Sequence, residues 1–123
     1  MSTFAEIMRN AVETTPGAVG GAFADSEGEM VDSFSTLDKH DWAVLTAHYG
    51  VVLSHLHSCF NTWHYGGPEY FIAQHAKFDV IVHTIAHGYF ALLALEEHDG
   101  SGQLAVALIS LRTACDKLRK EIA

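Results

Sequence analysis

The longest segment without a helix breaker other than Gly50 runs from Asp38 to about Trp63. At 100° per residue, its large apolar side chains fall within an arc of roughly 100°, the width of a stripe that faces a protein core. They are Trp42, Leu45, Tyr49, Val52, Leu53, Leu56, Phe60 and Trp63. The pattern therefore predicts one long helix with one side packed on the rest of the chain.

The opposite side of this predicted helix lacks the charges of an ordinary solvent-facing surface. Its residues are small or apolar, with almost no charge after Asp41. Small residues let two helices approach closely, and the simplest partner is the same helix in a second copy of the chain. We therefore predict a homodimer interface made by Val44, Ala47, Val51, Ser54, His55 and Ser58.

The stretch PGAVGGAFADSEGEMVDSF, from Pro16 to Phe34, carries three glycines in five residues. A phosphate-binding loop needs a strand, then the glycines, then at once a helix. Here the glycines lie inside an alternating small and apolar run, and a turn sequence, Asp-Ser-Glu-Gly, follows that run. The order predicts a β-hairpin with glycines in its first strand, where another segment approaches closely.

In the rest of the chain, segments with the apolar periodicity of a helix alternate with segments with that of a strand. A short helix is expected at the start, three strands joined by tight connections follow the long helix, and a last helix begins at a Ser101 cap. The fold class is therefore α+β, with a five-stranded antiparallel sheet and helices packed on it, in one domain, 1–123. The expected ranges are Thr3 to Glu13, Glu29 to Ser35, Glu69 to His75, Asp79 to Ala86 and Tyr89 to Glu96.

The charge balance limits the classes of partner. Seven basic and fifteen acidic residues give a formal charge of -8, which opposes nucleic acid and anionic membranes. The N-terminal segment has no basic stretch followed by an apolar run, so we expect no signal peptide, no membrane span and a cytoplasmic location. Cys59 and Cys115 lack CxxC spacing and are expected to be reduced core thiols.

Nine histidines make a metal site the first chemistry to test. His83 and His87 share a strand face but lie about 13 Å apart at strand spacing. His75 with His83 across a turn, or His55 with Cys59 on the long helix, supplies only two ligands, although dimerisation would double the second pair. No GxSxG nucleophile motif is present. The carboxylates of Glu96, Glu97 and Asp99 cluster at a predicted strand-to-helix turn, where a solvated loop explains them. We therefore predict no catalytic, metal or cofactor site, and no enzyme activity.

The order of elements resembles the Roadblock family of dynein light chain-related proteins. The resemblance rests on Pro16-Gly17-Ala18-Val19 before a strand, Asp25 and Gly28 at the hairpin turn, and the last strand from Tyr89 to Leu95. It implies a roadblock/profilin-like fold and a homodimer whose long helices and middle strands pair across a two-fold axis. It also implies a non-enzymatic role, in which such dimers bind small Ras-like GTPases or serve as scaffold subunits.

Stimulation of GTP hydrolysis often depends on an arginine finger. The three arginines, Arg9, Arg112 and Arg119, all fall on predicted helices rather than loops. We therefore expect contact with a partner through apolar residues, with Val106 and Ile109 on the last helix as candidates. Three functions remain open: a regulator of a small GTPase in cell polarity or motility, a structural scaffold subunit of a signalling or motor assembly with no direct GTPase contact, and a histidine-based sensor of a metal or small ligand. Besides a second copy and a small Ras-like GTPase, another roadblock-like or scaffold protein is a candidate partner.

Overall fold

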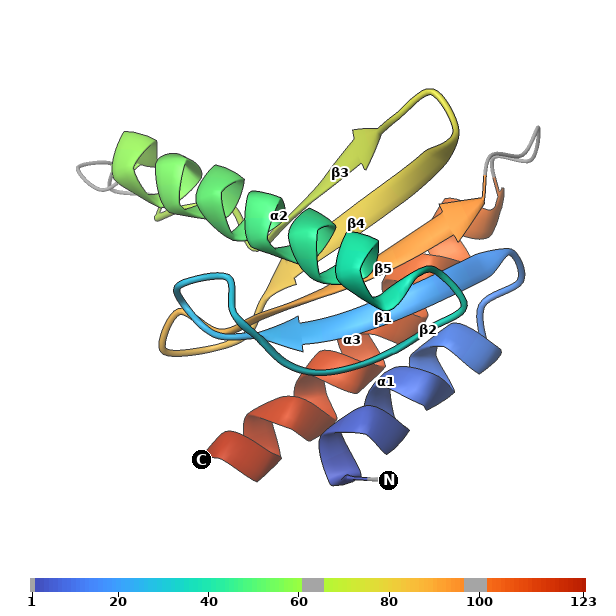
Figure 1. Ribbon diagram of the computed structural model, residues 1–123. Coiled ribbons are helices and arrows are strands. Elements are labelled where there is room, and N and C mark those ends of the chain that lie inside the picture. Colours follow the sequence, from blue (N-terminus) through green and yellow to red (C-terminus); the bar gives the residue numbers. More distant parts are fainter. Residues whose placement is uncertain (1, 61–65, 97–101) are drawn as a thin grey trace.

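The computed structural model describes residues 2–60, 66–96 and 102–123. Their elements follow the predicted order of helix, two strands, helix, three strands and helix (Figure 1). The bounds are α1 Thr3–Glu13, β1 Ala18–Ala24, β2 Met30–Ser35, α2 Lys39–Phe60, β3 Tyr70–Gln74, β4 Phe78–Thr84, β5 Phe90–Glu96 and α3 Gly102–Ile122. The predicted cap at Ser101 and the last residue of the predicted apolar stripe, Trp63, lie outside the described residues.

The five strands form one antiparallel sheet in the order β2-β1-β5-β4-β3. Helices α1 and α3 lie side by side on one face, and α2 alone crosses the other face (Figure 1). The predicted α+β class with a five-stranded antiparallel sheet is therefore confirmed. None of the described helices combines the length and apolar character needed to cross a membrane.

The glycines of β1 mark close approaches on both faces of the sheet. A Cβ atom at Gly21 would lie 3.0 Å from the Met8 Cε atom of α1. A Cβ atom at Gly20 would lie 3.1 Å from the Trp42 ring of α2. Because strand side chains alternate between faces, one glycine makes room for each layer. The prediction of a hairpin whose glycines admit close neighbours is confirmed.

Gly50 has a similar role inside α2. A Cβ atom there would lie 2.6 Å from the Gly28 Cα atom, in the turn of the β1–β2 hairpin. Gly28 itself has a φ of 81°, a backbone conformation that glycine adopts readily. The helix therefore accepts a residue of low helix propensity because the hairpin turn packs directly against its backbone.

The predicted apolar stripe of α2 is only partly buried. Trp42, Tyr49 and Leu53 are in the core, whereas Val52 is 42% exposed and Phe60 is 36% exposed. The prediction that all of these side chains face the core is therefore wrong. Periodicity identifies the apolar side of a helix, but it does not tell how much of that side the same chain covers. Cys59 is also exposed, contrary to prediction, while Cys115 is buried as predicted.

Candidate protein interface

Strand β3 forms one edge of the sheet. Within the described residues it pairs with β4 only, so its outer backbone groups have no strand beside them. Phe71 and Ala73 pack toward the α2 face, and Tyr70 and Ile72 lie on the α3 face with 37% and 40% exposure. An exposed edge strand with apolar side chains is a template for pairing with another chain.

A groove of about 630 Å³ lies between this edge strand and α2. One wall comes from the side of α2 that the chain leaves partly exposed, and the other comes from β3 and the residue after it. The lining is apolar apart from two histidines and one tyrosine, and it consists of Leu45, His48, Tyr49, Val52, Leu56, Phe71, Ala73 and His75. Three residues of the predicted stripe that the chain does not fully bury, Leu45, Val52 and Leu56, thus line this groove.

His75 is held in place at the end of β3. The Tyr49 hydroxyl of α2 hydrogen-bonds to the Nε2 atom of His75, and the imidazole stacks on the Phe78 ring at a centroid distance of 4.8 Å. Burial raises the pKa of Tyr49 above its ordinary value, so the hydroxyl keeps its proton at neutral pH. This contact ties α2 to the β3–β4 hairpin across one end of the groove.

The residues predicted for the homodimer interface lie on the side of α2 that points away from the sheet. Val44 and Val51 are 40% and 55% exposed, and Ala47, Ser54, His55 and Ser58 are exposed as well. Val51, Ser54 and His55 also border a hollow of about 300 Å³ beside the hairpin turn. Together with the groove, they give α2 an exposed surface of apolar and small or uncharged polar residues that continues around more than one side of the helix.

The two candidates for partner binding, Val106 and Ile109, are exposed on α3. Ile109, at 67% exposure, borders a hollow of about 440 Å³ between α1 and α3. This hollow is on the opposite face of the sheet from the groove. The structure therefore does not bring these two residues together with the predicted dimer interface.

Of the pairs considered for metal binding, His75 and His83 do not come together. His83 lies opposite Tyr70 in the β3–β4 register, not opposite His75, and the two histidines are on different faces of the sheet. The prediction that His75 and His83 can pair across the turn is therefore wrong, because the register differs from the one assumed. Among residues 2–60, 66–96 and 102–123, no group of three or more potential ligands is close enough to hold a metal ion.

All three arginines lie on helices, as predicted, and each is near a carboxylate. Arg9 is 3.1 Å from Glu13, and Arg119 is 2.9 Å from Asp116 on the same helix. Arg112 is 3.9 Å from Glu69 at the start of β3. A loop-borne arginine finger is therefore not a feature of this chain. The cluster around Arg112 was not predicted, because it depends on the pairing of β3 with β4 and on how α3 packs over both strands.

The fold is shared with roadblock domains of known structure. A Roadblock/LC7 domain from Streptomyces avermitilis superposes with a TM-score of 0.85 at 14% identity, covering 98% of each chain. MglB from Myxococcus xanthus gives a TM-score of 0.77 at 13% identity, again over 98% of each chain. MglC from the same organism gives 0.66 at 21% identity, over 94% of this chain and 96% of MglC. The chain therefore has the roadblock fold over nearly its whole length.

The likeness is one of structure rather than of sequence. No protein-family model matches the sequence, and no curated protein is similar to it at the sequence level. An MglB from Thermus thermophilus, described as a gliding protein, also shares the fold, at a TM-score of 0.78 and 12% identity. The resemblance noted from short sequence motifs is thus confirmed at the level of the fold.

Proposed function

We propose that this chain is a non-enzymatic adaptor or regulator that acts as a homodimer and binds a small Ras-like GTPase or its regulatory complex. The observation that carries the proposal is the apolar groove between α2 and the edge strand β3. The roadblock fold and its occurrence in gliding proteins support the choice of a regulatory adaptor over other soluble α+β proteins.

The dimensions of the two layers explain why a second copy suits the groove. Five strands spaced about 4.8 Å apart make a sheet roughly 20 Å wide, whereas a helix with its side chains is about 10 Å across. Two helices cover the α1–α3 face, but α2 alone cannot cover the other. A second α2, supplied by another copy across a two-fold axis, has the width that is missing.

The same two-fold arrangement would also give the outer backbone groups of the edge strand β3 hydrogen-bond partners. Strand β3 lies directly beside the groove, so a second copy seated there can align its own β3 antiparallel to the first. The exposed side chains of α2, including Val44 and Val51, would then border the contact between the two helices. This arrangement buries surface that is more apolar than an ordinary solvent-facing helix.

The GTPase contact is assigned to a surface outside the dimer groove. Val106 and Ile109 remain our candidates, because both are exposed apolar residues on α3 and Ile109 borders a hollow. Since each arginine lies on a helix near a carboxylate, we expect the protein to act by holding the switch segments of the GTPase in place.

Light scattering of the purified protein tests the dimer and the partner separately. We expect twice the protomer mass of 13.4 kDa. Val52→Glu should yield a folded monomer, because it places a charge in the groove. Val31→Glu is the matched control, since Val31 is 44% exposed on β2 and lies away from the groove, and this variant should stay dimeric. A dimer that survives Val52→Glu would refute the groove as the interface.

The second part of the experiment adds the small Ras-like GTPase whose gene lies nearest in the same genome. The GTPase is loaded with GDP or with a non-hydrolysable GTP analogue. A gain in mass with only one nucleotide state, lost in Ile109→Glu but kept in Val52→Glu, supports direct GTPase binding through α3. A dimer that is indifferent to both nucleotide states refutes direct binding and leaves the scaffold function. An equimolar metal signal in the purified protein would instead favour the histidine-based sensor.

A further inference from the structure

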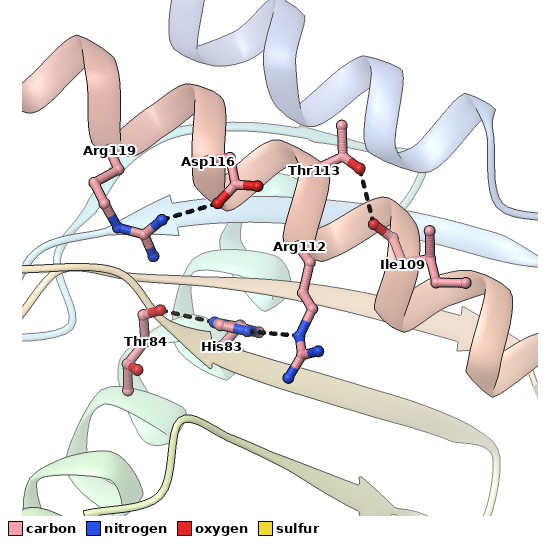
Figure 2. A network of polar contacts seen from close by, with 7 residues as sticks. All are labelled: His83, Thr84, Ile109, Arg112, Thr113, Asp116 and Arg119. Carbon is pink, nitrogen blue, oxygen red and sulfur yellow. Dashed lines mark hydrogen bonds and ion pairs between the residues drawn. The ribbon is translucent and has the colours of Figure 1, made fainter.

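The α3 face of the sheet has a hollow of about 320 Å³ where α3 passes over the end of β4. Two of the three arginines, Arg112 and Arg119, extend from α3 toward the strand, and His83 of β4 lies between them (Figure 2). His83 is only 7% exposed. A buried imidazole and two guanidinium groups therefore border the same small space.

The buried histidine has a defined protonation pattern. Its Nδ1 atom lies 2.7 Å from the Thr84 carbonyl oxygen, to which it can only donate, because a carbonyl has no proton. Its Nε2 atom then accepts from the Arg112 Nε–H group at 3.4 Å (Figure 2). The imidazole is thus neutral and serves as a support for the arginine.

The Tyr70 ring also holds Arg112 in place. Its guanidinium lies 5.2 Å above the centroid of the Tyr70 ring, and that ring stacks on the His83 imidazole at 5.9 Å and 16°. Stacking on an aromatic face and a bonded Nε atom restrict the orientation of the planar group. The two terminal NH2 groups of Arg112 are therefore presented as a preorganised fork, the geometry that binds a carboxylate with two parallel hydrogen bonds.

Among the residues that the structure describes, the fork has only a weak acidic partner. Its acidic neighbour, Glu69, is 3.9 Å away, and the Glu69 side chain is 80% exposed. Arg119 contrasts with it, because Arg119 makes a direct 2.9 Å contact with Asp116. A long, exposed ion pair contributes little and is easily exchanged for a better-placed anion.

The second half of α3 has a net positive charge, although the protein as a whole is acidic. The second half of α3 carries four of the seven basic residues of the chain, against two acidic ones; the basic residues are Arg112, Lys117, Arg119 and Lys120. Burial raises the pKa of Cys115, which also borders the hollow, to about 12, so that its thiol adds no negative charge at neutral pH. This half of the helix is a positive surface on a chain with a formal charge of -8.

From this geometry we propose that the hollow between α3 and β4 binds an aspartate or glutamate carboxylate from an acidic segment of a partner protein. The incoming carboxylate takes the Arg112 fork and displaces Glu69 toward solvent. The two arginines and the two carboxylates of the site balance in charge, and replacing one monoanion by another keeps that balance. A phosphate dianion would leave excess negative charge beside Asp116, so the charges favour a carboxylate. The inference does not rest on the proposed GTPase contact.

A labelled tetraglutamate peptide is the probe, and the binding is followed by the NMR signals of the Arg112 Nε–H group and the His83 ring. We expect saturable shifts of both signals and binding that Arg112→Gln weakens about tenfold, the loss of one charge-assisted pair. Arg112→Lys, which keeps the charge and loses the fork, should weaken binding too. Arg9→Gln is the matched control, since Arg9 is a similarly exposed arginine in an ion pair on α1.

Three results would overturn the proposal. Equal weakening by Arg9→Gln would show that only net charge matters. With both peptides amidated at the C-terminus, binding of tetraglutamine as strong as that of tetraglutamate would show that no side-chain carboxylate is recognised. Tighter binding of inorganic phosphate than of tetraglutamate, with the same two NMR signals shifted, would show that the ligand class is wrong.

Discussion

The two faces of the sheet are formed by the same strands, but helices cover them to different extents. On the α1–α3 face, Phe23, Leu93 and Leu111 are completely buried. On the other face, Leu53 is the last buried residue of α2, and Val52 beside it borders an open groove. Hydrophobic content does not decide which face is left open, because both faces are apolar. The number of helices that cover each face decides it.

The largest expected difference between the faces is in core energetics. Leu93→Ala should lower the free energy of unfolding by about 3 kcal/mol, as for other fully buried leucines. Leu45→Ala, at the groove, should lower it by about 1 kcal/mol or less when measured at protein concentrations too low for dimers. Urea denaturation followed by circular dichroism measures both. Equal losses would mean that the groove is closed in the protomer.

The close contact between α2 and the hairpin should give an intermediate effect. Gly50→Ala gains up to about 1 kcal/mol in helix propensity but forces the Gly28 backbone to move, with a net loss of about 1–2 kcal/mol. Ser54→Ala, one turn later and exposed, should change stability by less than about 0.5 kcal/mol. Thermal denaturation of the two variants compares them, and a stabilised Gly50→Ala variant would contradict the close packing.

The smallest effects concern the two thiols. Cys59 is exposed and Cys115 is buried with its pKa raised to about 12, so one thiol per chain should react quickly with a disulfide reagent at pH 8. The second should react only on unfolding. A count of two fast thiols in the native protein would contradict this assignment.

The raised pKa also predicts how stability changes in alkali. The folded protein keeps the Cys115 proton that the unfolded chain releases near the ordinary thiol pKa of 9.0, so this contribution is complete below pH 9 and declines as the pH rises toward about 12. Cys115→Ser should therefore show a shallower loss of stability between pH 9 and 11. An unchanged slope would assign the alkaline loss to other groups, with Tyr49 the next to test because burial raises its pKa as well.

Local patterns in the sequence were sufficient to predict the elements of the fold. The glycines of β1 and the turn at Gly28 predicted the hairpin, because strand alternation and turn chemistry act over a few residues. The exposure of Val52 could not be predicted, since it depends on how far α2 reaches across the sheet. The contact of His83 with Arg112 joins two distant segments, and its single local signal was a histidine inside the apolar run of β4.

The strand order has a consequence for how the chain acquires its structure. The centre of the sheet is the pair β1 and β5, in which residue 24 lies opposite residue 90. The first hairpin therefore leaves the ribosome long before its central neighbour has been synthesised. Because closing so long a loop is slow, we expect folding to wait for β5 and to proceed more slowly than in helical proteins of equal length. Until then the edge of β1 that pairs with β5 has no partner strand, and such unpaired edges make an incompletely folded chain prone to aggregation.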